Sequence, residues 1–259
     1  MHLHATAFWV PKAGNQDSEY EDAYCPIGPI DAEGASLSRF AVADGATETS
    51  FSRLWAKQLV EAYIAGEFEK IPDWKWLAEL QEKWSSTVNS KPLPWYAEQK
   101  IESGAFAAVV GLTLTSPEAD SQAGTWHAEA IGDSCLFQIR DSQIVTKFPL
   151  GAAEEFTNSP TLIASKPGEA SGLASLVLKE GGWECGDQFY LMTDAVAAWF
   201  LWATENSESP WEIVRDLDAA DEATAGEFGL RSFRQWVDCA RAQGLMRNDD
   251  VTLYRIEIA

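Results

Sequence analysis

Nine segments of the chain are short apolar runs or alternate between apolar and polar residues, and turn residues such as Gly, Pro and Asp border most of them. This pattern predicts β-strands, because successive side chains of a strand point to opposite faces. The predicted strands cover residues 4–10, 22–27, 37–43, 105–115, 124–131, 134–140, 172–179, 187–193 and 250–258.

Five other segments carry apolar residues at helical spacing. The first predicted helix begins at Phe51, with Thr49 or Ser50 as its N-cap, and ends at Gly66. The other predicted helices cover 73–89, the residues after Asp194, the residues after Pro210, and 224–243.

The order of these elements is strands, helices, a block of strands, helices and one last strand. This order favours an antiparallel α+β layering over the strict strand and helix alternation of a doubly wound fold. The stripes of aromatic residues are read as core packing. No linker, repeat or low-complexity tract interrupts the chain, so residues 1–259 are predicted to form one domain.

Two segments show no clear periodicity. Residues 11–21 are polar, contain Pro and Gly, and read as a loop that leads into the second strand. Residues 149–170 contain three prolines. Long irregular segments of compact domains are often lids or recognition loops, so 149–170 is a candidate lid, with unstructured surface as the equal alternative.

The net charge of the chain limits the kinds of molecule that it can bind. Forty acidic and nineteen basic residues give a formal net charge of −21, which repels nucleic-acid phosphates and anionic lipid surfaces. The start of the sequence lacks a basic segment followed by a long apolar one, and no run of eighteen apolar residues occurs. We therefore expect a cytoplasmic, monomeric protein that binds neither nucleic acid nor membranes.

Cysteine and histidine offer little material for catalysis or zinc binding. The four cysteines are far apart, form no Cys-x-x-Cys pair, and are predicted to be buried free thiols: Cys25, Cys135, Cys185 and Cys239. Three histidines are too few for a His-rich zinc site and leave little for a Ser-His-Asp triad. His2 and His4 alternate on the predicted first strand, where a surface position is favoured over metal binding.

An acidic residue stands at the end of several predicted strands. Asp44, Asp133 and Asp194 each stand at the end of such a strand, and Asp249 and Asp250 stand at the start of the last one. For any single Asp a turn or a helix cap is the plainer interpretation. Several at equivalent places in a layered fold would meet at one rim, where like charges repel unless protons or cations lie between them.

Oxygen ligands select hard cations such as Mg²⁺ or Mn²⁺ rather than zinc. Two such ions about 3.5–4 Å apart can share a carboxylate and make a bridging water acidic enough to become hydroxide. That arrangement suits the hydrolysis of a phosphate ester.

The order of these motifs resembles that of the metal-dependent type 2C Ser/Thr protein phosphatases. The matching motifs extend over nearly the whole chain: Glu21-Asp22-Ala23, Val42-Ala43-Asp44-Gly45, Ser103-Gly104-Ala105, Gly132-Asp133-Ser134, Thr193-Asp194 and Asp249-Asp250-Val251-Thr252. The resemblance implies an α+β fold, a sandwich of two antiparallel β-sheets flanked by α-helices. It also implies two or three bound ions of Mn²⁺ or Mg²⁺.

The resemblance also implies roles for individual residues. Asp44 would bridge both ions and the carbonyl of Gly45 would ligate one of them. Asp194 and Asp249 would complete the first metal site, and Glu21 would bind the second ion. Asp44 and Asp194 would be the residues most directly involved in catalysis.

Three further acids receive less direct roles from the resemblance. Asp22 would be oriented behind the second ion through bound water, and Asp133 would help to hold a third, weaker ion. Asp250 stands where the family usually has Asn, so it is either a supporting group or an extra negative charge.

The chain departs from the family pattern where the substrate binds. Many members have an Arg shortly before the Glu-Asp pair to bind the substrate phosphate, but here Lys12 is the nearest cation. Ala46 stands where some members have a His that protonates the leaving group. Asn15-Gln16-Asp17 is a rival for the Glu21-Asp22 motif, which we prefer because it leads directly into a strand.

Three further positions also differ from the pattern. The usual Gly-Ser-Thr is Gly104-Ala105-Phe106, the Arg after Gly-Asp-Ser is Cys135, and the Gly after Thr-Asp is Ala195.

The leading hypothesis is therefore an enzyme that hydrolyses phosphoserine or phosphothreonine in proteins. The missing Arg and His motivate one alternative, a phosphatase-like binding module with little turnover. A phosphatase of small-molecule phosphate esters is a second alternative, because it would use the same chemistry.

Overall fold

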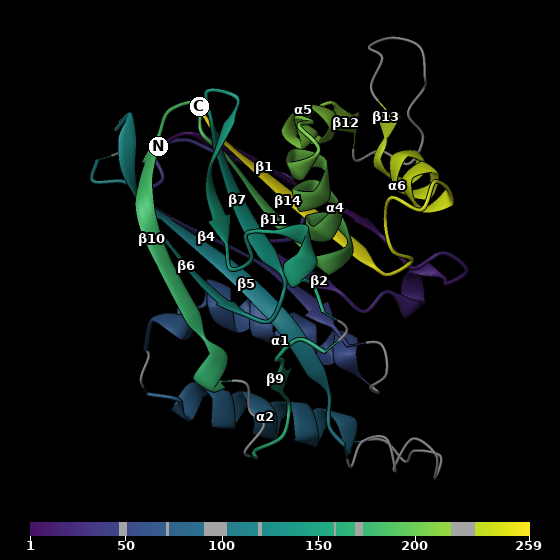
Figure 1. The fold of residues 1–259 in the computed structure, drawn as a ribbon. Coiled ribbons are helices and arrows are strands. Elements are labelled where there is room, and N and C mark those ends of the chain that lie inside the picture. Colours follow the sequence, from purple (N-terminus) through teal and green to yellow (C-terminus); the bar gives the residue numbers. More distant parts are fainter. Residues whose placement is uncertain are drawn as a thin grey trace.

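The computed structural model describes residues 1–46, 51–70, 73–90, 103–118, 121–157, 159–168, 173–218 and 231–259. Two antiparallel sheets pack face to face, and helices cover both outer faces (Figure 1). Sheet A has the strand order β3 (Ile30–Ala32), β1 (Leu3–Val10), β14 (Val251–Ile258), β11 (Gln188–Met192), β7 (Cys135–Arg140) and β8 (Gln143–Phe148). Sheet B has the order β10 (Val177–Glu184), β6 (Ala123–Ile131), β5 (Phe106–Thr115), β4 (Leu37–Gly45) and β2 (Ala23–Cys25), and β9 (Ile163–Ala164) pairs with β5.

Three apolar layers hold this sandwich together. The central layer lies between the sheets and contains Phe40 and Leu112 from sheet B against Phe189 and Ile256 from sheet A. Their side chains are almost fully buried because alternate residues of each strand face the other sheet. The predicted α+β sandwich of two antiparallel sheets flanked by helices is confirmed.

The helices bury their apolar stripes on the outer faces. Helices α1 (Ser52–Ile64) and α2 (Lys75–Val88) contribute Trp55 and Trp84 to the layer on sheet B. Helices α4 (Asp194–Glu205), α5 (Pro210–Arg215) and α6 (Phe233–Ala242) form the layer on sheet A, where Phe200 stacks on Phe137 of β7. Short 3-10 turns lie at Asp17–Glu19, Phe68–Lys70, Ala153–Glu155 and Leu173–Ser175, and Leu217–Asp218 (β12) pairs with Arg231–Ser232 (β13).

Strands β10 and β8 differ from the prediction, and the short strands β3 and β9 were not predicted. Strand β10 begins five residues later than expected and continues through Gly181 and Gly182, which read as a strand end in the sequence. A side chain at Gly181 would meet the Trp126 ring at 2.6 Å, so the glycine makes room for that indole. Strand β8 was not predicted. It forms a tight hairpin with β7, whose two-residue turn consists of Asp141 and Ser142, both at positive φ.

Other differences are local. Helix α6 begins at Phe233 after the short strand β13, and the earlier part of its predicted range lies outside the described residues. Thr49 and Ser50 also lie outside them, and Phe51 is the N-cap of α1. The prediction of free cysteines is confirmed, but their predicted burial is wrong except at Cys135, because Cys185 lies in a turn and Cys239 on the open side of α6.

No helix among the described residues has the length and apolar character to cross a membrane.

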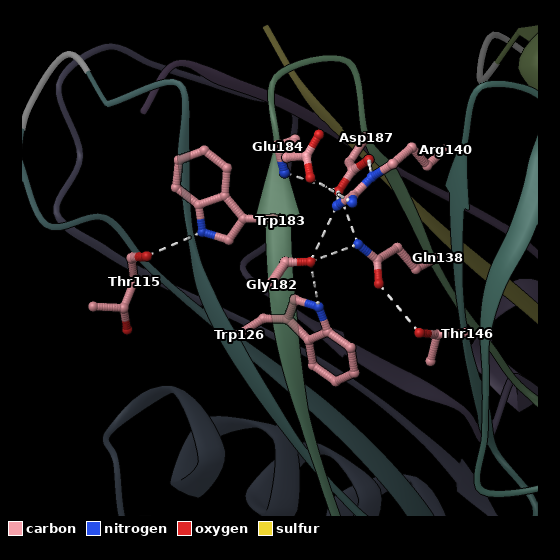
Figure 2. A network of polar contacts seen from close by, with 9 residues as sticks. All are labelled: Thr115, Trp126, Gln138, Arg140, Thr146, Gly182, Trp183, Glu184 and Asp187. Carbon is pink, nitrogen blue, oxygen red and sulfur yellow. Dashed lines mark hydrogen bonds and ion pairs between the residues drawn. The ribbon is translucent and has the colours of Figure 1, made fainter.

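A partly buried ion pair ties the two sheets together where the chain crosses from β10 to β11 (Figure 2). Arg140 of β7 donates from Nε and Nη2 to the two carboxylate oxygens of Asp187, each at 2.7 Å. Arg140 and Gln138 also donate to the carbonyl of Gly182 on β10, at 3.2 and 3.0 Å. Because these donors come from sheet A and the Gly182 carbonyl from sheet B, the network fixes the open edge of the sandwich.

We expect Asp187→Ala to lower the free energy of unfolding by about 2–4 kcal/mol, because it removes a fully buried carboxylate and leaves its donors unpaired. Urea unfolding measures the change. Glu184→Gln is the matched control, since this second partner of Arg140 is exposed, and its cost should stay below about 1 kcal/mol. Equal effects of the two changes would contradict the inferred role of Asp187.

Candidate active site

The predicted acids meet at one rim of the sandwich because the strands that carry them pair there. In sheet A, Met192 at the end of β11 pairs with both Leu253 and Cys135, so Asp194 lies beside the starts of β14 and β7. In sheet B, Ala43 of β4 pairs with Ala23 of β2, so Asp44 and Asp22 follow the same rim.

Asp44 lies within electrostatic reach of the acids from both sheets. Burial raises the pKa of its carboxyl well above the ordinary value, and the charges of Asp22, Asp194, Asp133 and Asp249 raise it further. These are the acids that the motifs singled out. The sequence separates them by more than two hundred residues, and the fold brings them together around Asp44.

Asp22 is buried behind this group and held by two threonines. Its Oδ2 accepts hydrogen bonds from the hydroxyls of Thr193 and Thr252, at 3.0 and 2.7 Å, while its Oδ1 is buried without a hydrogen-bond partner. Tyr20 hydrogen-bonds to the Thr252 hydroxyl. Burial, followed by the charge of Asp250, raises the pKa of Asp22. The threonines therefore fix the orientation of a carboxylate that keeps one oxygen unused.

Asp194 opens helix α4, where the positive end of the helix dipole favours a carboxylate. Arg247 donates from Nη2 to Asp194 Oδ2 at 2.7 Å, and Asp194 Oδ1 is buried without a hydrogen-bond partner. Burial raises the pKa of Asp194, whereas the Arg247 charge lowers it. Arg247 was not predicted from the sequence, because the family pattern places the phosphate-binding arginine before the Glu21-Asp22 pair. The signal in the sequence was an arginine two residues before Asp249.

Asp250 binds two backbone N–H groups, and this explains why the chain has Asp where the family usually has Asn. Its Oδ1 accepts the backbone N–H of Lys12 at 2.7 Å, and its Oδ2 accepts the backbone N–H of Glu21 at 2.6 Å. Two acceptor oxygens are needed for these two donors, and an Asn side chain supplies only one. Asp250 therefore fastens both ends of the loop 11–21 to the start of β14.

Glu21 lies next to Asp44 along the rim but points toward helix α1. Its Oε1 accepts a hydrogen bond from the Ser52 hydroxyl at 2.5 Å. A side chain at Gly45 would stand 2.6 Å from the Glu21 carbonyl oxygen, so the two backbones approach so closely that only glycine fits. Asp17 of the rival motif is instead exposed in a 3-10 turn and pairs with Arg234.

Asp133 lies in the turn between β6 and β7, beside the segment 149–170. Burial and the charge of Asp194 raise the pKa of Asp133 to about 7. A side chain on Gly132 would come within 3.3 Å of the Thr161 carbonyl oxygen, so the segment passes next to this turn. At Ile163 the segment is anchored, because its carbonyl accepts the Trp55 indole N–H at 2.9 Å.

The residues at the rim fit hard divalent cations. Their donor set consists of oxygen atoms, two buried oxygens on Asp22 and Asp194 have no hydrogen-bond partner, and the carboxyl groups repel one another. Within the described residues, no three rim carboxylates bring one oxygen each within 4.8 Å of the other two. Waters would supply the remaining ligands of an ion held by one or two of these carboxylates, which is how Mg²⁺ is usually bound.

Comparison with known proteins assigns the class. The family model of protein phosphatase 2C matches residues 16–247. The chain belongs to the protein phosphatase 2C family, which confirms the resemblance found in its motifs. No curated protein sequence matches this chain.

Solved structures support the same fold at low sequence identity. The serine/threonine phosphatase PstP of Mycobacterium tuberculosis is 15% identical with a TM-score of 0.55, and covers 100% of this chain and 99% of its own. A second structure of the PstP catalytic domain holds two manganese ions and has a TM-score of 0.53 at 15% identity and the same coverage. PppA of Pseudomonas aeruginosa, a regulatory component of its type VI secretion system, is 16% identical with a TM-score of 0.52 and again the same coverage.

We expect Asp44→Asn to stabilise the chelated protein, because it removes one of several like charges. The same change should abolish the rise in melting temperature that Mn²⁺ gives the wild type. Thermal unfolding with EDTA and with Mn²⁺ measures both effects. Asp17→Asn, at an exposed acid outside the cluster, should leave the Mn²⁺ effect unchanged.

The pH dependence of this gain follows from the direction of the pKa shift. A raised pKa means that the folded chelated protein holds its proton at low pH and is destabilised by ionisation as the pH rises. The gain from Asp44→Asn should therefore be larger at pH 8 than at pH 5. A variant that is less stable than the wild type in EDTA at pH 8 would contradict the inferred repulsion.

Proposed function

We propose that this chain hydrolyses phosphoserine and phosphothreonine in proteins, with Mn²⁺ or Mg²⁺ bound by the rim acids. Membership of the protein phosphatase 2C family supports the reaction. The observation that carries the proposal is the buried group of carboxylates around Asp44, which has unused oxygens on Asp22 and Asp194. Such a group is costly to keep without cations.

The proposed ligands are the acids of the rim. Asp44 would be the central ligand, because the charges of Asp194 and Asp249, from sheet A, act on it. Glu21 and the carbonyl of Gly45 would bind on the side of sheet B. Asp133 is the candidate for a further, weaker ion beside Asp194, whose charge acts on it. Bound divalent cations lower the pKa of water and neutralise charge on phosphoryl oxygens.

The surrounding residues keep this arrangement in place during the reaction. Water attacks phosphorus, the bond to the Ser or Thr oxygen breaks, and the alcohol leaves with a proton. Thr193 and Thr252 hold Asp22, and Asp250 holds the loop 11–21, so the acids do not have to reorganise when charge develops on the phosphate.

Several finer features belong to the same proposal. The net charge of −21 supports a partner that is a phosphorylated protein rather than nucleic acid or a lipid surface. We propose a cytoplasmic monomer in which residues 1–259 form one domain and the segment 149–170 borders the substrate. Phosphopeptides with basic residues beside the phosphate should be preferred over acidic ones, and salt should weaken this preference.

Phosphate release from a phosphothreonine peptide tests the proposal. Turnover should require Mn²⁺ or Mg²⁺, stop with EDTA, and fall by about 10²-fold or more in Asp194→Asn. Asp216→Asn, at an exposed acid outside the rim, is the matched control. Binding of the peptide without release under saturating Mn²⁺ would favour a binding module, and faster release from sugar or nucleotide phosphates would favour a small-molecule phosphatase.

We also propose that Arg247 contacts the substrate phosphate in place of the family's usual Arg. Its guanidinium is bonded directly to Asp194 and remains 43% exposed, so it is both close to the acids and open to a ligand. An arginine fork matches phosphate oxygens well. In the absence of substrate the same group competes with cations for Asp194 Oδ2.

Arg247→Gln should therefore have two opposite effects. The apparent affinity for Mn²⁺ should rise, because the competing guanidinium is gone, while the KM for the phosphopeptide should increase about tenfold or more. Calorimetry and steady-state kinetics measure the two quantities. Arg215→Gln, on the far helix α5, serves as a charge-matched control, and a variant with unchanged KM would exclude Arg247 from substrate binding.

A further inference from the structure

Two histidines and an aspartate meet on the outer face of sheet A, away from the acidic rim. His4 on β1 pairs directly with Asp31 on β3, and His2 stands two positions before His4, on the same face of the strand. Leu3 and Ala5 alternate with them and are buried between the sheets. The three polar side chains therefore project together from the opposite, solvent-facing side.

The three side chains offer ligand atoms at suitable distances. His2 Nε2 and His4 Nδ1 lie 2.9 and 3.3 Å from the same oxygen, Oδ1 of Asp31. All three ligand atoms lie within 4.8 Å of one another. In a tetrahedral zinc site with bonds of about 2.0–2.1 Å, ligand atoms are about 3.3 Å apart. The observed group needs only small side-chain rotations to surround one ion.

The backbone beneath the group is well anchored. Leu3, between the two histidines, pairs with Ala32 of β3 and with Ile258 of β14, and the carbonyl of His2 accepts the N–H of Ala259 at 2.9 Å. Strand pairing thus places the ligands before any ion binds, which reduces the conformational entropy lost on binding. Glu257 pairs with His4 from the other side and adds negative charge to the same face.

The group is separate from the acids at the rim. The opposite end of β1, Val10, pairs with Val251 at the start of β14, next to Asp250. Val10 lies six positions after His4 along the extended strand, which corresponds to about 20 Å at a rise of about 3.3 Å per residue. An ion at the histidines therefore cannot be one of the ions held around Asp44.

We propose that His2, His4 and Asp31 form a second metal site, specific for a transition-metal dication such as Zn²⁺. Imidazole nitrogens favour Zn²⁺ and Co²⁺, whereas sites with oxygen ligands alone favour Mg²⁺ and Mn²⁺. The site would clamp the short edge strand β3 onto β1, because its ligands come from both strands. Three protein ligands leave one position for water. This site does not depend on the proposed phosphatase reaction.

Co²⁺ is the probe, because its visible absorption is strong in four-coordinate sites and weak in octahedral oxygen sites. Untagged protein is first saturated with Mn²⁺ and then titrated with Co²⁺. We expect one equivalent of Co²⁺ to produce the strong band and Zn²⁺ to remove it. Bound Zn²⁺ should also raise the melting temperature of the Mn²⁺-loaded protein.

The band and the Zn²⁺ stabilisation should be lost in His4→Gln and in Asp31→Asn, whose side chains are exposed enough for the variants to fold normally. His127→Gln, a histidine beside two carboxylates on the other sheet, is the matched control and should keep both. Absence of the band in the wild type, or its survival in both site variants, would overturn the proposal. Neither result depends on phosphate release, so failure of the proposed function would be recognised separately.

Discussion

The structure of the rim depends on the mutual repulsion of acids that the fold brings together. The charges of Asp22, Asp194, Asp133 and Asp249 act on the partly buried carboxyl group of Asp44. This arrangement lowers the stability of the fold. The repulsion is moderated by neighbours and never removed. Hydroxyl groups hold Asp22 and the start of helix α4 supports Asp194. The rim therefore keeps an excess of negative charge, which attracts cations. This attraction is the basis of the proposed chemistry.

The sandwich makes this concentration of charge possible. Strands from two sheets end at the same rim, so each contributes an acid without having to change its own register. The apolar layers between and outside the sheets fix those ends, as at Phe200 on Phe137. The apolar layers supply the stability of the fold, so the rim can hold acidic residues that destabilise it.

The acids, their order and the layered fold were accessible from sequence because they rest on local patterns: alternation along strands, helical spacing, and an Asp at a strand end. Features that depend on contacts between distant segments were not accessible. Gly181 looks like the end of a strand in the sequence, but in the structure the Trp126 indole occupies the space that a side chain at this position would need. The partners of Asp250 become visible only when the loop 11–21 lies against β14, and the role of Arg247 only when it is seen to contact Asp194. Cys239 looked apolar in sequence, but its side of α6 faces solvent.

The attachment of the loop 11–21 has an evolutionary consequence. Asp250 grips main-chain N–H groups, which every residue other than proline possesses. The exposed side chains of residues 13–19 can therefore be exchanged without displacing the segment, whereas Tyr20 is buried and bonded to Thr252. The sequence of this loop can thus change by mutation while the underlying scaffold stays in register.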